Sequence, residues 1–255
     1  MPKQQPVSAS LSSLLHRSGK TVYSGSSPVS KSFIGWECEG DYHSPAPVYD
    51  KLIMSFLEIL KKYSLHGYHC TRLTEEEIVD VKENGLKLRN TSTLYERVNK
   101  LLTAHLIRKN VAQSLLNNNQ SGDNNRANML WFCFFPPYLG GQHGIERFFR
   151  HWGGEALYNS HEENPVTGKR LQKIGIPCVV EALVPLGSMP NATLPDGQFI
   201  RSYLKEKGYS LENGLEYESY ITDSLNPANI IEVHQFPSKT FIELTECDYW
   251  DDPLS

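Results

Sequence analysis

The chain has 255 residues, of which 39% are hydrophobic and 21% are charged, and its formal net charge is −4 at pH 7. These values are typical of a globular protein that can bury a sizeable core. The small net charge argues against coating nucleic acid by bulk charge, although a local basic patch is compatible with it. Five scattered cysteines without a Cys-x-x-Cys pair indicate a reducing compartment and no disulfide framework.

No segment is predicted to enter a membrane. The longest apolar run, MLWFCFF at 129–135, is far shorter than the roughly 20 residues that a membrane-spanning helix needs. The N-terminus lacks the charged start and long apolar block of a secretory signal. We therefore expect a cytoplasmic protein.

The first half of the chain is predicted to be helical around one short strand. Residues 1–45 are rich in Ser, Pro, Gly and Lys and predict a loosely ordered arm, which leaves 46–255 as the main domain. Thr74 and Glu77 form a capping box for a helix that ends at Gly85. The flanking elements are predicted from apolar spacing, namely a helix over 48–63, a strand over 68–73 and a long helix over 94–116.

The second half reads mainly as strands. The polar loop at 117–128 precedes a buried strand at 129–135, and 144–158 predicts a short helix, a Gly-Gly break and an aromatic turn. A further helix is expected over 197–208. Four β-rich runs predict strands: 176–186, 215–225, 229–236 and 240–246. Because helices come early and strands late, the sequence predicts an α+β fold.

Two short motifs place polar side chains on a common strand face. His69 and Thr71 lie two positions apart, so they can present an imidazole and a hydroxyl to one ligand, although such a pair is more often structural. Cys70 should turn into the core, so it cannot easily share a metal ion with His69, and no metal site is expected. Glu216 and Glu218 also share a face, either as edge-strand charges or as a site within an internal strand.

These motifs carry a family resemblance. The segment YHCTRLTEEEIVDVKENGL resembles the opening of the ADP-ribosyltransferase superfamily, especially its DarT-like and RNA-phosphotransferase-like branches. EYESYITDSLNPANIIEV is similar to the last motif of that superfamily, and the resemblance spans about 64–236. It implies a split β-sheet with N-terminal helices, which holds NAD in a cleft.

The resemblance also implies roles for individual residues. His69 would contact the ribose or the nicotinamide end of NAD with support from Thr71, Glu218 would be the catalytic glutamate, and Glu216 would orient the attacking nucleophile. The middle motif departs from the family because it has no Ser-Thr-Ser run. The candidates for the stacking aromatic are Trp131, Tyr138, Trp152 and Tyr158. The candidates for the pyrophosphate, each equally readable as a surface arginine, are Arg72, Arg147 and Arg150.

The implied activity is mono-ADP-ribosylation of a macromolecule. A carboxylate beside the ribose would stabilise the oxocarbenium-like cation that forms as cationic nicotinamide leaves, so no metal is needed. The acceptor would be RNA, DNA or protein, with nucleic acid favoured, as for a bacterial toxin or phage-defence effector that has a protein antitoxin. Two alternatives remain open: a catalytically silent binding module of the same fold, and an NAD glycohydrolase.

Overall fold

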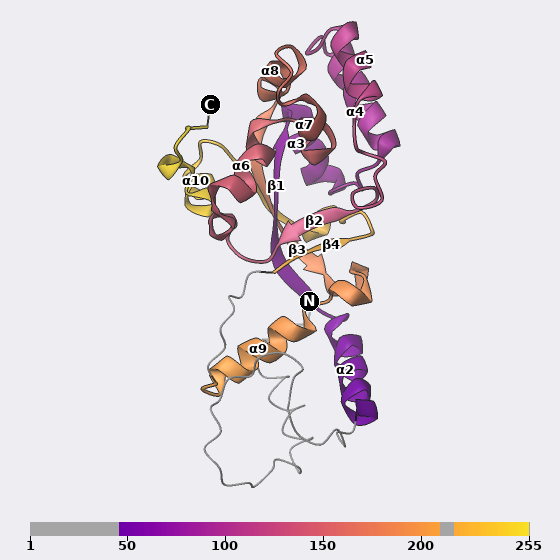
Figure 1. Ribbon diagram of the computed structural model, residues 1–255, viewed down its shortest axis with the longest axis vertical. Helices are drawn as coiled ribbons and strands as arrows, with labels where there is room; N and C mark the ends of the chain where they lie inside the picture. The colour runs from indigo at the N-terminus through magenta and orange to yellow at the C-terminus, as the bar shows by residue number, and fades with distance from the viewer. Residues whose placement is uncertain (1–45, 210–216, 255) are drawn as a thin grey trace.

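A computed structural model of the chain describes residues 46–209 and 217–254 (Figure 1). The predicted arm at 1–45 and the candidate residue Glu216 lie outside the described residues. Within the described part, no helix is both long and apolar enough to cross a membrane.

Five strands form one open antiparallel sheet in the order β4-β2-β1-β3-β5. The strands are β1 Ser64–Leu73, β2 Leu130–Cys133, β3 Ile176–Pro185, β4 Glu218–Ile221 and β5 Ile230–Gln235. β1 is central in the sheet and pairs with β3 along its whole length. An antiparallel sheet with separate helices confirms the predicted α+β class.

The helices pack around this sheet and extend beyond both of its ends. They are α2 Ala46–Leu60, α3 Glu75–Asn84, α4 Thr91–Thr103, α5 Lys109–Asn117, α6 Gly141–Arg150, α7 Glu155–His161, α8 Thr167–Gln172, α9 Asp196–Glu206 and α10 Lys239–Thr245. Figure 1 shows α4, α5, α7 and α8 at one end of the molecule and the neighbouring helices α2 and α9 at the other.

The two faces of β1 and β3 belong to different hydrophobic clusters. Leu73 and Val180 pack with Ile78 of α3 on one face. On the other face, Val179 packs with aromatic residues of α6 and α10, among them Phe149. A third cluster joins α4, α5, α7 and α8. These clusters fix the positions of the helices that surround β1.

The predicted start and end of α3 are confirmed. The Thr74 side chain accepts a hydrogen bond from the Glu77 backbone, and the Glu77 carboxylate accepts one from the Thr74 backbone. Gly85 follows with φ 80°, and a Cβ at this position would lie 1.9 Å from the carbonyl oxygen of Leu225. Only glycine fits this turn, because it tolerates both the backbone angle and the close approach.

Three of the predicted elements differ from the structure. The aromatic turn expected at the end of 144–158 belongs to helix α7. The helix expected over 94–116 is divided into α4 and α5, because His105 has φ 55° and interrupts the helical backbone. The strand expected over 240–246 was wrong, since this segment lies mostly within helix α10. The Ser238 hydroxyl caps that helix by accepting a hydrogen bond from the Phe241 backbone.

Candidate functional site

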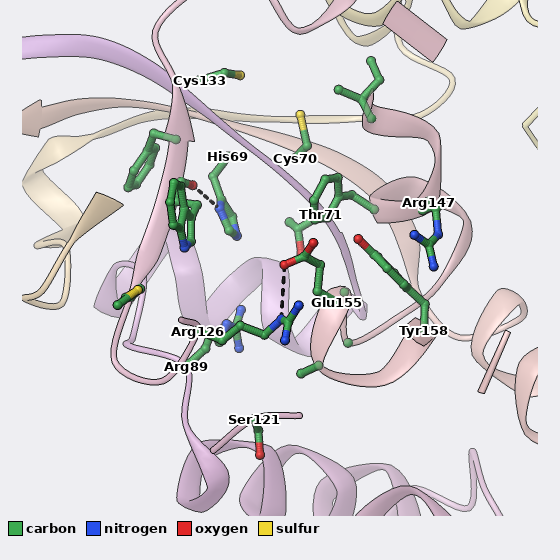
Figure 2. Close-up of a pocket in the computed structure, with 18 of the residues that line it drawn as sticks. His69, Cys70, Thr71, Arg89, Ser121, Arg126, Cys133, Arg147, Glu155 and Tyr158 are labelled. Carbon is green, nitrogen blue, oxygen red and sulfur yellow. Dashed lines mark hydrogen bonds and ion pairs between the residues drawn. The ribbon is translucent and has the colours of Figure 1, made fainter. Parts of the chain in front are cut away.

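β1 and β2 separate immediately beside the predicted His-x-Thr motif. Tyr68 of β1 pairs with Cys133 of β2, and this is the one residue pair that joins these two described strands. β1 nevertheless continues beside β3 as far as Leu73. Across the gap, Nδ1 of His69 lies 2.8 Å from the carbonyl oxygen of Trp131 (Figure 2). The separation of the strands exposes this part of β1 to a pocket.

The pocket at this separation has a volume of about 740 Å³. This volume lies in the range of sites that bind small molecules and cofactors. Its walls come from β1, β2, α4, α6, α7 and the loop that precedes β2. The charged side chains that line it, apart from histidines, are Arg89, Arg97, Arg126, Arg147, Glu155 and Glu218. The excess of arginine favours an anionic ligand.

His69 is held neutral in this pocket. Burial lowers the pKa of His69 to about 4, and the nearby charges of Arg89 and Arg97 act in the same direction. The hydrogen bond to Trp131 acts in the opposite direction but is outweighed. A carbonyl oxygen only accepts hydrogen bonds, so Nδ1 of His69 must carry the proton. In a neutral ring, Nε2 is then an acceptor. His69 can therefore receive a hydrogen bond from a ligand hydroxyl.

The side chains of β1 alternate as predicted, but the pocket reaches both faces. Figure 2 shows His69 and Thr71 pointing to one side of the strand and Cys70 to the other. All three residues line the pocket, so Cys70 is not confined to the core as expected, although it also packs against the cluster of α6 and α10. The neighbouring Cys133 thiol and burial raise the pKa of Cys70, which therefore remains a thiol.

Glu218 lines the pocket on the face of the sheet that carries Cys70. It lies opposite Cys133, which in turn lies opposite Tyr68. Directly opposed residues of antiparallel strands have their side chains on the same face of the sheet. The side chain of Glu218 is therefore on the face opposite to that of His69. Glu218 is exposed, and desolvation raises the pKa of its carboxyl group. The predicted residues are thus in one pocket but approach it from different sides of the sheet.

Glu155 is a second carboxylate that sequence reasoning did not single out. It is the first residue of α7 and follows Gly153 and Gly154, whose φ angles of 93° and 61° aim the chain back toward β1. Its Oε2 lies 3.2 Å from Nε of Arg126. Figure 2 shows Glu155 on the same side of β1 as Thr71. The Gly-Gly break in the sequence was the signal that could have indicated it.

The four candidate aromatics have different positions. Trp131 and Tyr158 line the pocket, whereas Tyr138 and Trp152 are not among its lining residues. Trp131 is 44% exposed, and the buried Tyr158 packs under the guanidinium of Arg147 at 4.0 Å. Burial and the Glu155 carboxylate raise the pKa of Tyr158. Of the four candidates, Trp131 and Tyr158 are thus the two that line the pocket.

Trp152 belongs to the interior beside the pocket. It is fully buried, and its Nε1 donates a hydrogen bond of 2.8 Å to the Glu77 carboxylate. The guanidinium of Arg97 lies 4.3 Å above its ring. Trp152 therefore supports a residue that lines the pocket, and does not itself line it.

The predicted arginines are mostly engaged elsewhere. Arg72 is buried and donates to the carbonyl oxygens of Ile174 and Phe149, so its role is structural. Arg150 pairs with Glu146 and with residue 252 near the C-terminus. Arg147 lines the pocket but donates two hydrogen bonds to Glu162. The remaining arginines of the pocket were not predicted, because they come from loops and helices outside the recognised motifs.

Searches against protein-family models, curated proteins and solved structures found no match to this chain. In the described residues, no group of three or more His, Cys, Asp or Glu side chains is arranged to hold a metal ion. The pocket and the resemblance of the two sequence motifs are therefore the features that point to a function.

Proposed function

We propose that this pocket binds NAD and that the protein is a mono-ADP-ribosyltransferase with the split-sheet fold of that superfamily. The observation that carries the proposal is the neutral His69, whose Nε2 can accept a hydrogen bond, placed where β1 separates from β2 in an arginine-lined pocket. The separation of these two strands is the feature that a split sheet requires. The adjacent Thr71 adds a hydroxyl on the same side.

Three parts of NAD have chemically matched groups in the pocket. A ribose hydroxyl can donate to Nε2 of His69, and the Thr71 hydroxyl can pair with the same sugar. Trp131 or Tyr158 can stack on the nicotinamide ring. The arginines can hold the pyrophosphate. The set thus covers the nicotinamide, one ribose and the pyrophosphate of NAD.

The reaction needs one carboxylate near the anomeric carbon. The bond between nicotinamide N1 and ribose C1′ breaks, and its electron pair neutralises the nicotinamide ring while C1′ becomes an oxocarbenium-like cation. A carboxylate stabilises this cation and takes the proton of the acceptor nucleophile, which then forms a bond to C1′. Glu218 is the candidate from the resemblance, and Glu155 is the candidate from the position of its side chain near Thr71.

A nucleic-acid acceptor is favoured over protein by an aromatic pair beside the pocket. The rings of Trp131 and Tyr220 have centroids 4.8 Å apart, and Trp131 is exposed. These residues lie on β2 and β4, next to the position of Glu218. Exposed aromatic rings provide stacking surfaces for unpaired bases. Such an activity fits a toxin or phage-defence effector in the cytoplasm, controlled by a protein antitoxin.

The test incubates the full chain with NAD labelled in the adenylate phosphate and with separate RNA, DNA and protein pools. We expect label on RNA or DNA. Replacing the catalytic carboxylate, in Glu155→Gln or Glu218→Gln, should lower transfer by roughly 10²-fold or more. The exposed Glu83 lies outside the pocket lining, so Glu83→Gln is the matched control and should be unaffected. NAD binding without consumption would instead identify a silent binding module, and NAD consumption without labelled acceptor would identify a glycohydrolase.

A further inference from the structure

The guanidinium of Arg89 is a cation in the pocket wall, and it has no direct counter-ion among the described residues. It lies just before α4 and lines the pocket beside His69 (Figure 2). No residue in 46–209 or 217–254 forms a hydrogen bond or ion pair with its guanidinium. Burial and the neighbouring Arg97 lower the pKa of Arg89 to about 9, with partial opposition from Glu77 and Asp80. The protein therefore holds a charge there that an external anion would stabilise.

Arg97 is only partly satisfied by its neighbours. Its Nε lies 2.5 Å from Oε1 of Glu77, while its Nη2 is buried and has no hydrogen-bond partner among the described residues. The Glu77 carboxylate is already shared, since it also accepts from Trp152 Nε1 and from the Thr74 backbone. The single Glu77 carboxylate, which already accepts two other hydrogen bonds, thus lies near the guanidinium groups of both Arg89 and Arg97. This leaves an excess of positive charge.

The other arginines of the pocket are paired with carboxylates. Arg126 contacts Asp123 and Glu155, and Arg147 contacts Glu162. The uncompensated charge therefore lies along the first half of α4. Arg89 lies just before the helix, where the helix dipole adds positive potential, and Arg97 lies in its second turn. Both Arg89 and Arg97 also lower the pKa of His69, which places their positive charge near that ring.

We propose that Arg89 and Arg97 form the subsite that holds the diphosphate of an ADP-ribose-containing ligand. A diphosphate supplies oxygens in the geometry that guanidinium groups bind in a bidentate manner. His69, whose Nε2 can accept a hydrogen bond, lies near the charges of Arg89 and Arg97. A ribose attached to the diphosphate can therefore reach this nitrogen. The identity of the ligand rests on the proposed function, but the phosphate chemistry of the subsite does not depend on catalysis.

The test measures binding of ADP-ribose, ADP and inorganic pyrophosphate to the full chain by calorimetry. Arg89→Met removes the unpaired charge and should weaken ADP-ribose binding by about tenfold or more, because a charge-assisted contact is lost. Arg89→Lys should restore part of the affinity. Arg108→Met is the matched control, since Arg108 is exposed and outside the pocket lining, and it should change the affinity less than about twofold.

Thermal unfolding is a second measurement, which shows whether the Arg89→Met variant is folded. Removing a partly buried charge that has no partner among the described residues should raise the melting temperature of Arg89→Met in the absence of ligand, while the stabilisation by ADP-ribose should shrink. The subsite is wrong if wild-type protein binds neither ADP-ribose nor pyrophosphate, or if Arg89→Met binds ADP-ribose as tightly as wild type. If Arg89→Met loses ADP-ribose but wild type releases no nicotinamide from NAD, the subsite stands and the proposed function fails.

Discussion

Glu77 holds Arg97 in the wall of the pocket, and the effect of replacing Glu77 on the free energy of unfolding can be calculated. Its carboxylate pairs with Arg97 and accepts hydrogen bonds from Trp152 and from the Thr74 backbone. Burial alone would raise the pKa of Glu77, but the pairing with Arg97 overcomes it and lowers the value from 4.5 to about 2. This difference corresponds to about 3 kcal/mol, at about 1.4 kcal/mol per pH unit.

The sign of the pH dependence follows from the direction of this change. A carboxyl group whose pKa is lower in the folded state stabilises the protein fully above pH 4.5, and this stability is lost as the pH falls toward 2. Glu77→Gln should therefore reduce the free energy of unfolding by about 3 kcal/mol at pH 7. The difference between Glu77→Gln and wild type should shrink below pH 4.5.

The assay is urea unfolding of both proteins at several pH values from 7 to 3.5. Glu76→Gln is the control, because Glu76 is exposed and pairs only with Lys100, and it should change the unfolding free energy by less than about 1 kcal/mol. The reasoning would be refuted by a Glu77→Gln variant as stable as Glu76→Gln. It would also be refuted by a difference that stays constant from pH 7 to pH 3.5.

Three further predictions concern β1. His69→Ala should weaken NAD binding as well as turnover, because a ground-state contact is lost, and calorimetry with NAD checks this. The pKa of His69 is lower in the folded state than its ordinary 6.5, so wild-type stability should decline as the pH falls from 6.5 toward 4. His69→Gln should lessen that decline in thermal unfolding measured across this range, and the remainder should come from His151 and His161, whose pKa values burial also lowers. Cys70→Ala should lower the unfolding free energy through lost packing, while NAD turnover should stay within about twofold of wild type. Intact stability with lost turnover would contradict a packing role for Cys70.

Local signals in the sequence predicted the central part of the fold. The capping box of Thr74 and Glu77 and the turn at Gly85 are specified by residues close together in the chain, so they could be predicted. The strand was predicted from Tyr68, although β1 begins at Ser64, and its alternation predicted that His69 and Thr71 share one side. That this side faces a ligand cleft was implied by the family resemblance. The capping box, the turn and the alternation depend on neighbours within a few residues.

The features that were missed depend on contacts between distant segments. The break at His105 and the helical state of 240–246 are set by packing and capping that apolar spacing does not specify. Glu155 and Arg89 reach the pocket because α7 and the segment before α4 fold back toward β1. The Gly-Gly break marks the turn before Glu155, but no local pattern indicates that Arg89 shares a site with His69.

The most direct test of the central claim is the release of free nicotinamide from NAD by the purified full chain. We predict release above the enzyme-free blank, faster with single-stranded RNA or DNA present than without it. Release should fall by roughly 10²-fold or more in the double variant Glu155→Gln/Glu218→Gln, which lacks both carboxylates that line the pocket. Release that never exceeds the blank in any acceptor pool, or that is unchanged in the double variant, would contradict the account.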